Sequence, residues 1–309
     1  MDSRSVMSGQ GWIWIALALG AALILLGVYW RARRVQAARA QARALAAARA
    51  ADPTAPARVQ VRRLRTHTQH PIVLAHGWGS FDRLLPVQLG YSYFRGIPDG
   101  LRARGHVVHV ARVPPTASIE LRAQQLARQI KRLDERVNIV AHSMGGLDAR
   151  LAIARYGLHD RVASLTTIGT PHHGTPLADV AFVLGEWRRS RRLLSQLGWN
   201  IDGVYDVSTA RMLDFNRQVP DAPDVLYTNV VAAADPTAGG VHAMLAAGYR
   251  YLLRISGPND GIVPAQSQRW GETLEEVDAD HWAQIGWFAR FDVHGFYARI
   301  AQRLAEREL

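Results

Sequence analysis

The chain from Thr68 to Leu309 alternates short apolar runs with longer segments of helical periodicity. A short apolar run bounded by turn residues is typical of a strand, whereas apolar residues three and four apart indicate a helix. The strand-like runs are Ile72 to Ala75, Val107 to Ala111, Val137 to Ala141, Val162 to Ile168, Val225 to Ala232 and Tyr251 to Ile255, and one helical stripe is Ile119, Leu126, Ile130 and Leu133. This alternation predicts one α/β domain with a mostly parallel sheet and helices on both faces.

The N-terminal part is predicted to be a separate module. Residues 12–30 carry no charged side chain and have tryptophan at both ends, and as a helix they would span roughly 28 Å, enough to cross a bilayer core. A cleaved signal peptide is the alternative, but its apolar region is shorter and ends in an Ala-x-Ala-like site. Here Arg31, Arg33 and Arg34 follow instead. We therefore expect a tail over 1–11, a retained transmembrane anchor over 12–30 and an Ala/Arg-rich juxtamembrane helix and linker over 31–67.

Most of the net charge of +11 lies in this N-terminal part, where eleven arginines are balanced only by Asp2 and Asp52. The domain that follows is close to neutral, which argues against nucleic-acid binding. A cationic segment beside a membrane span instead favours contact with anionic membrane lipid. The positive-inside rule then predicts a single-pass protein of the inner (cytoplasmic) membrane with its main domain in the cytoplasm. The chain has no cysteine, so disulfides do not indicate the compartment.

The most informative motif is Ala141-His142-Ser143-Met144-Gly145, directly after a strand-like run. It matches a nucleophile elbow, a sharp strand-to-helix turn that lifts the serine Oγ above the sheet. The turn requires small residues two positions before and two after the serine, and Ala141 and Gly145 meet that requirement. An isolated match of this length is weak, because a strand end followed by a helix start has the same pattern.

Further elements that this chemistry needs occur in the required order of serine, acid and histidine. Upstream, residues 71–79 predict a strand running into a glycine-rich turn, and we assign the oxyanion hole to the backbone N–H groups of Trp78 and Met144. Downstream, Asp260 lies in the turn Gly257 to Gly261 and is the candidate acid. His281 follows it and is the candidate base.

Each of these residues has a rival interpretation. Asp260 lies in a Gly-Pro-Asn-Asp-Gly turn, where aspartate is common for conformational reasons alone. His172 and His173 precede the acid and so violate the order, while His242 and His294 compete with His281; we interpret His294 as a surface or packing residue and His76 as a brace for its loop. Asp280 is adjacent to His281, so its side chain is poorly placed to orient that ring.

From Pro71 to the C-terminus, the chain resembles the bacterial triacylglycerol lipases of the α/β-hydrolase superfamily, both the chaperone-dependent and the thermostable branch. The matching blocks are Pro71 to Gly79, Val137 to Arg150, Leu165 to Gly174, Asn259 to Val263 and, more weakly, Asp280 to Leu304. The Thr-Ile-Gly-Thr-Pro-His-x-Gly block is more specific to this group than the elbow. The resemblance implies the α/β-hydrolase fold, the triad Ser143, Asp260 and His281, and a helical lid over about 176–209. It also implies secretion, contrary to the charge rule, and leaves the topology open.

One departure from the family concerns a metal. These lipases commonly bind a structural calcium through an acidic residue two positions after the catalytic histidine, and that position is Ala283 here. Calcium needs six to eight oxygen ligands with carboxylates among them. We therefore expect no calcium site of the family type, no zinc site and no cofactor.

Taken together, the sequence predicts a membrane-anchored serine ester hydrolase, a lipase that cleaves carboxylic esters of acylglycerols through an acyl-enzyme. A phospholipase, a polyester depolymerase or a thioesterase could use the same triad. A non-catalytic membrane scaffold is the alternative from another class, and an elbow, acid and histidine in the right order argue against it. The expected partners are a lipid ester substrate and membrane lipid, and the need for a folding chaperone stays open.

Overall fold

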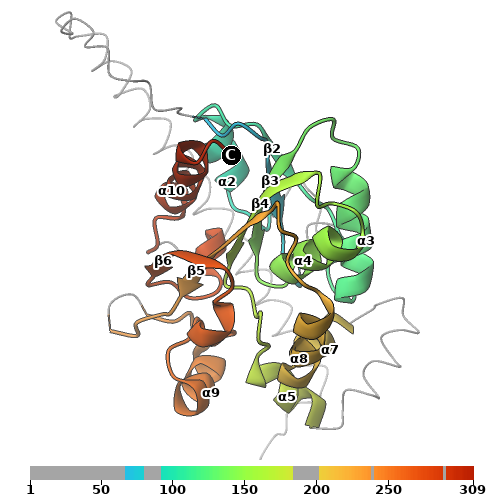
Figure 1. Cartoon of the computed structure of the whole chain (residues 1–309). Helices are drawn as coiled ribbons and strands as arrows, with labels where there is room; N and C mark the ends of the chain where they lie inside the picture. The colour runs from blue at the N-terminus through green and yellow to red at the C-terminus, as the bar shows by residue number, and fades with distance from the viewer. Residues whose placement is uncertain (1–66, 80–91, 184–201, 238–239, 288–289) are drawn as a thin grey trace, which may run out of the picture. The chain divides into compact units, whose positions relative to one another are not determined.

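The structure is a computed structural model that describes residues 67–79, 92–183, 202–237, 240–287 and 290–309 (Figure 1). Contacts between residues divide the chain into two units, 1–62 and 63–309, and every described residue belongs to the second unit. The predicted tail, transmembrane anchor and juxtamembrane helix lie outside the described residues, as do residues 184–201 of the predicted lid.

Six parallel strands form the sheet at the centre of the second unit. They are β1 (Ile72–Ala75), β2 (Val108–Val110), β3 (Val137–His142), β4 (Val162–Ile168), β5 (Leu226–Ala232) and β6 (Glu272–Val277). Their order across the sheet is β2-β1-β3-β4-β5-β6, and each neighbouring pair is parallel. The predicted α/β architecture is confirmed. Because the strands are parallel, the loops after β1, β3 and β4 leave the sheet at the same edge, which is where open α/β sheets place their ligands.

Helices cover both faces of this sheet. Helices α3 (Ile119–Ile130) and α4 (Gly145–Arg155) pack on one face, and α2 (Ile97–Arg102) and α10 (Val293–Glu306) pack on the other (Figure 1). The remaining elements are α5 (Pro176–Val183), α7 (Asp202–Asp206), α8 (Thr209–Gln218), α9 (Ala246–Ser256) and the short 3-10 turns η2 (Ala265–Gln268) and η3 (Ala283–Ile285). In Figure 1, α5, α7, α8 and α9 gather at the lower end of the sheet.

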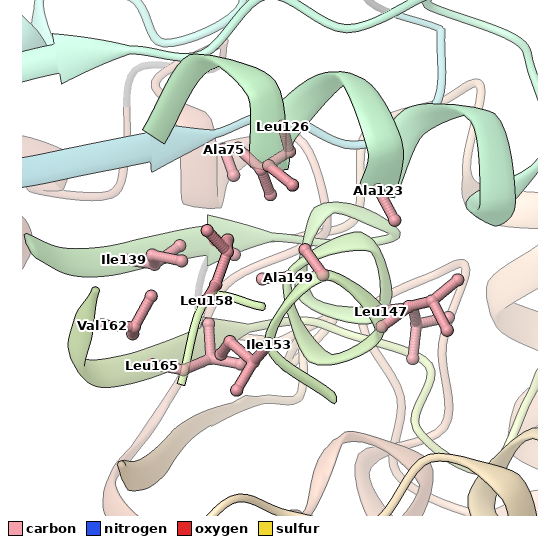
Figure 2. Packing of buried hydrophobic residues seen from close by; sticks show 14 of the residues in the cluster. Ala75, Ala123, Leu126, Ile139, Leu147, Ala149, Ile153, Leu158, Val162 and Leu165 are labelled. Atoms are coloured by element: carbon pink, nitrogen blue, oxygen red, sulfur yellow. The ribbon is translucent and has the colours of Figure 1, made fainter. Parts of the chain in front are cut away.

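Two hydrophobic clusters hold the layers together, one on each face. Successive residues of a strand point to opposite faces, so Val73 and Ala75 of β1 pack under α3 and α4, whereas Ile72 and Leu74 pack under α2 and α10. Figure 2 shows the first cluster, in which Leu126 of α3 and Ile153 of α4 pack with strand residues. The helical stripe expected before the elbow is buried in this cluster, and its last member, Leu133, packs against it beyond the end of α3.

The sequence interpretation was wrong at one strand and missed another. The run Tyr251 to Ile255, expected to be a strand, belongs to helix α9. Its buried residues Tyr249 and Leu252 are three apart, while Tyr251 and Ile255 are exposed, and this spacing is that of a helix. The segment resembled a strand in the sequence because it contains short runs of consecutive apolar residues. The missed strand is β6, which carries three glutamates. It pairs on one side only, with β5, and charged side chains are common on such edge strands.

The expected single-pass inner-membrane localisation is corrected by the structure. Within the ranges described above, no helix combines the length and the apolar character that crossing a bilayer requires. Residues 12–30, on which the expectation depended, are outside those ranges. An apolar run in a sequence indicates a span only if it forms a long continuous helix, and no such helix supports the assignment here.

Candidate active site

Ser143 lies in the sharp turn between β3 and α4, with a positive φ of 57°. This left-handed conformation is strained for a residue other than glycine and costs on the order of 1–3 kcal/mol. Hydrogen bonds fix the turn: the Ser143 N–H donates to the Ile168 carbonyl (2.8 Å), and the Ser143 carbonyl accepts from Thr170 Oγ1 (2.7 Å). A Cβ on Gly145 would lie 2.6 Å from the Ala75 carbonyl oxygen, so the small residue that the elbow pattern requires is needed for a close backbone approach.

The structure brings Ser143, His281 and Asp260 into one line of hydrogen bonds. His281 Nε2 is 3.0 Å from Ser143 Oγ, and His281 Nδ1 is 2.6 Å from Asp260 Oδ2. Asp260 is fully buried and His281 is 4% exposed. These three side chains come from the loops after β3, α9 and β6, so residues far apart in the sequence meet beside the carboxyl edge of the sheet.

The Asp260 carboxylate is held by several donors besides His281. Its Oδ1 accepts from the backbone N–H groups of Ile262 (3.0 Å) and Val263 (2.7 Å), and its Oδ2 also accepts from Gln284 Nε2 (3.0 Å). The backbone N–H of His281 in turn donates to the backbone carbonyl of Asp260 (2.8 Å). Hydrogen bonds to an ionised group are the strong ones in proteins, so this carboxylate has a fixed orientation.

The loop after β1 carries Trp78, the first expected oxyanion donor, and it approaches Ser143 closely. A Cβ on Gly77 would lie 2.7 Å from Ser143 Cβ, so only glycine allows this approach. Arg122 of α3 holds the loop: its Nη2 donates to the His76 carbonyl (2.7 Å), and its Nε donates to Asp148 of α4 (2.9 Å). Met144, the second expected donor, directly follows Ser143.

The rival histidines occupy other places. His172 is buried against the Trp270 ring with its Nε2 3.0 Å from Thr167 Oγ1, and burial and the Arg150 charge hold its pKa well below the usual value. His294 is exposed on α10, and His76 Nδ1 contacts the Gly77 carbonyl within its own loop (2.8 Å). His242 packs against the Trp282 ring. The described histidine whose ring is hydrogen-bonded to Ser143 Oγ is His281.

Three buried residues near the hydrogen bonds between Ser143, His281 and Asp260 were not found from the sequence. They are Tyr93, His142 and Gln284. His142 is next to the serine and Gln284 is three residues after His281, but neither position has a pattern that marks it. Their proximity to the site becomes visible only when the loops after β3 and β6 meet.

Ser143 and His281 open onto a cavity of about 600 Å³. Most of its wall is apolar and comes from the loop after β1, from α5, from the region of α7 and from the loops before α9 and α10. Wall residues include Trp78, Leu177, Val207, Met244, Ile285 and Trp287. A mostly apolar cleft with a few convergent polar groups is typical of a site for an apolar small molecule.

The residues around His281 do not fit the calcium site that the family resemblance implies. Ala283 is a buried alanine whose N–H donates to Asp280 Oδ1 (2.8 Å). Asp280 Oδ2 accepts from the His242 N–H (2.8 Å), so both oxygens of this carboxylate already bind backbone groups and link two loops without a metal. In the described part of the chain, no three acidic, histidine or cysteine side chains are grouped as a metal site requires.

We predict that treatment with EGTA leaves both the melting temperature and the esterase activity nearly unchanged. A metal that binds only the folded state stabilises it by mass action, and its removal lowers the melting temperature. Differential scanning calorimetry with and without the chelator measures this, and readdition of Ca²⁺ is the control. A drop of many degrees that Ca²⁺ reverses would contradict the prediction.

Comparisons with known proteins agree with the fold and the motifs. The model of the PGAP1-like alpha/beta domain matches residues 119–196. Triacylglycerol lipase 2 of Saccharomyces cerevisiae is 28% identical over 311 residues, covering 77% of this chain and 92% of the yeast protein. A triacylglycerol lipase of Vibrio cholerae is 42% identical over 121 residues, covering 37% of this chain and 36% of that lipase.

Solved structures show the same fold. The Staphylococcus hyicus lipase aligns with a TM-score of 0.63 at 19% identity, covering 81% of this chain and 100% of that one. The mature Bacillus licheniformis lipase BlEst2 aligns with a TM-score of 0.61 at 23% identity, covering 81% and 96%. Together with the sequence relatives, this fold supports a serine ester hydrolase of the α/β-hydrolase superfamily. Within that superfamily it is a lipase.

Proposed function

We propose that this lipase cleaves carboxylic esters of acylglycerols through an acyl-enzyme on Ser143, with His281 as the general base and Asp260 as the acid that orients it. The observation that carries the proposal is the line of hydrogen bonds from Ser143 Oγ to His281 (3.0 Å) and on to Asp260 (2.6 Å). This line has the connectivity by which a histidine activates a serine hydroxyl, with a buried carboxylate fixing the tautomer of the ring.

In the first half of the reaction, His281 Nε2 takes the Ser143 hydroxyl proton as Oγ attacks the ester carbonyl carbon. The negative oxygen of the tetrahedral intermediate accepts hydrogen bonds from the backbone N–H groups of Trp78 and Met144. The carbon–oxygen bond to the alcohol then breaks, and His281 gives its proton to the leaving alkoxide. In the second half, His281 removes a proton from water, which attacks the acyl-serine ester and releases the carboxylic acid, and Ser143 recovers its proton.

The cavity and the relatives support the proposed substrate class. Its apolar wall suits an acyl chain, which must leave water to reach Ser143. The yeast and Vibrio cholerae relatives are named triacylglycerol lipases. The segment 176–209 is expected to cover this cavity as a lid; because much of it lies outside the described residues, that role stays a prediction.

Labelling with a fluorophosphonate ester tests the proposal. The wild-type enzyme is expected to be labelled on Ser143 and inactivated in proportion, while Ser143→Ala stays unlabelled. A series of triacylglycerols of increasing chain length, with a phospholipid and an acyl thioester for comparison, then tests the substrate class. An enzyme that resists labelling would contradict the serine mechanism, and faster cleavage of the phospholipid or thioester would contradict the acylglycerol assignment.

A further inference from the structure

Gln284 in η3 is a fully buried side chain that the mechanism above does not use. Its Nε2 donates to Asp260 Oδ2 (3.0 Å), the same oxygen that accepts from His281 (2.6 Å). Gln284 is 0% exposed. A glutamine with no access to water must find partners for its amide inside the protein, because an unpaired buried polar group is costly. Its nitrogen has such a partner in the carboxylate that orients the histidine.

The other end of the amide faces His142. Gln284 Oε1 and His142 Nε2 are both buried, and among the described residues neither atom has a hydrogen-bond partner of normal geometry. Burial and the neighbouring His281 hold the pKa of His142 well below the usual value, so this ring is neutral. The Gln284 side chain and the His281 backbone lie close enough to oppose this shift in part.

Tyr93 contacts the other nitrogen of the His142 ring. The Tyr93 hydroxyl is 2.7 Å from His142 Nδ1. If this hydroxyl donates, the neutral ring carries its proton on Nε2, where it faces Gln284 Oε1. Two hydrogen bonds flank this pair of atoms, Tyr93 to His142 on one side and Gln284 to Asp260 on the other. The His142 ring also packs on the His281 ring, with 4.6 Å between the ring centres.

The backbone leaves space for the amide at a specific glycine. Gly169 follows β4 with φ of 57°, and a Cβ there would lie 2.3 Å from Gln284 Oε1 and 3.2 Å from Asp260 Oδ2. Any larger residue would displace the glutamine amide. Gly169 belongs to the Thr-Ile-Gly-Thr-Pro-His-x-Gly block, so this block supplies part of the wall around the acid.

We propose that Gln284 is a positioning residue for the reaction at Ser143: its amide nitrogen shares the negative charge on Asp260 Oδ2, the oxygen that orients His281, and so sets how strongly that carboxylate holds the ring. This inference rests on the proposed function of Ser143, Asp260 and His281. The two backbone N–H groups on Oδ1 keep the carboxylate in place when the amide is removed. The expected consequence of removal is therefore a change in the charge on Oδ2, rather than a loss of the Asp260–His281 contact.

Gln284→Met tests the proposal, because methionine is close in size and cannot hydrogen-bond to either partner. A carboxylate that has lost a donor attracts the imidazolium form of His281 more strongly. We expect the acid limb of the kcat/KM profile on a short soluble ester to move to higher pH by about half a unit or more. We expect kcat to fall about tenfold, as for one lost hydrogen bond to a charged group, with KM nearly unchanged.

Within the described ranges, few titratable groups surround His281. Asp260 and His142 contact its ring, Tyr93 contacts His142, and Asp280 precedes it and caps the following turn. Gln268→Met is the matched control, because Gln268 is an equally buried glutamine whose amide binds the backbone of Ala232 and Val263. It should lower the melting temperature in the same way but leave the acid limb in place. If the acid limb of the kcat/KM profile of Gln284→Met stays at the wild-type pH or moves to lower pH, the proposal is overturned.

Gln284→Glu keeps the shape of the side chain. It therefore separates the effect of hydrogen-bond donation to Asp260 from the effect of packing. Burial and Asp260 disfavour ionisation of the introduced carboxyl, so at low pH it can still donate to Asp260. We expect near wild-type kcat there and a new loss of activity as the pH rises and this carboxyl ionises. A profile that matches Gln284→Met at every pH would overturn the proposal. Full activity of Ser143→Ala would refute the proposed function. If Ser143→Ala is inactive but the acid limb of Gln284→Met stays at the wild-type pH, only the role of Gln284 is refuted.

Discussion

Replacement of Ser143 by alanine is expected to lower kcat on a short soluble ester by about four to six orders of magnitude. The reason is that the proposed acyl-enzyme forms on Ser143 Oγ, and alanine has no atom that can replace it. The cavity, the proposed oxyanion donors, His281 and Asp260 all remain. Ser143→Ala should therefore still hydrolyse the ester faster than water alone does. Steady-state kinetics measures the loss, and an unchanged melting temperature shows that the fold is intact.

His281 and Asp260 are expected to act together with Ser143, so the effects of substituting them should not add. His281→Ala is expected to cost about as much as Ser143→Ala, and Asp260→Asn less, because the histidine still acts as a base when it is poorly oriented. A combined Ser143→Ala and His281→Ala variant should be little worse than either alone. His294→Ala is the control, since His294 is exposed on α10, and it should leave kcat nearly unchanged. Inactivation by His294→Ala would contradict the assignment of the base.

Arg122→Met is expected to destabilise the enzyme by about 3–5 kcal/mol and to lower its melting temperature by roughly 10 °C. Arg122 is fully buried and its guanidinium contacts Asp148, the Pro114 carbonyl and the His76 carbonyl. Methionine fills much of the same volume but leaves the buried Asp148 carboxylate without its cation. The His76 carbonyl also loses its donor, so the loop that carries Trp78 is held less firmly and kcat should fall as well.

The destabilisation should depend on pH in a defined direction. Burial raises the pKa of Asp148 to about 6, and Arg122 opposes this by favouring the charged form. Without Arg122, the pKa in the folded state rises further above the value of about 4 in the unfolded chain. Stability is then lost as the pH rises above about 4, because the unfolded chain releases its proton first. Urea unfolding at pH 4 and pH 8 should therefore show a larger loss at pH 8.

A second substitution separates the ion pair from the loop contact. Adding Asp148→Leu to Arg122→Met removes the unpaired carboxyl, and replacing a buried ion pair by apolar residues is often nearly neutral. We expect the double variant to regain most of the melting temperature but to keep the low kcat, because nothing restores the hydrogen bond to the His76 carbonyl. If stability and kcat recover together, Arg122 has no separate role in holding the oxyanion loop.

The proposed nucleophile, Ser143, could be selected from the sequence because the conformation it needs is set by neighbouring residues. A serine with φ of 57° between a strand and a helix needs small neighbours, and Ala141 and Gly145 can be found by inspection. The acid and histidine were selected by their order along the chain, and the structure brings both to Ser143. The strands β1, β3 and β4 were also predictable, because each is a short, mostly apolar run bounded by turns.

Elements without such local constraints were missed or misassigned. Helix α9 was mistaken for a strand because a few apolar residues in succession satisfy both patterns, and only its packing with Tyr249 and Leu252 inward decides the helix. Strand β6 has a polar sequence and is a strand because β5 offers it a hydrogen-bonding edge. The transmembrane assignment of residues 12–30 came from their apolar content, their terminal tryptophans and the arginines that follow, and no described helix supports it.

The sequence by itself determined the class of chemistry, because the elbow, the glycine-rich loop and the order of acid and histidine are set by short-range steric rules and by chain order. Only the tertiary structure decided what surrounds that chemistry. Gln284 reaches Asp260, His142 lies against His281, and Arg122 holds the loop that carries Trp78, each across a long separation in sequence. The physical reason is that a buried polar side chain takes the partner that folding brings to it, and nothing in its neighbouring residues specifies which partner that is.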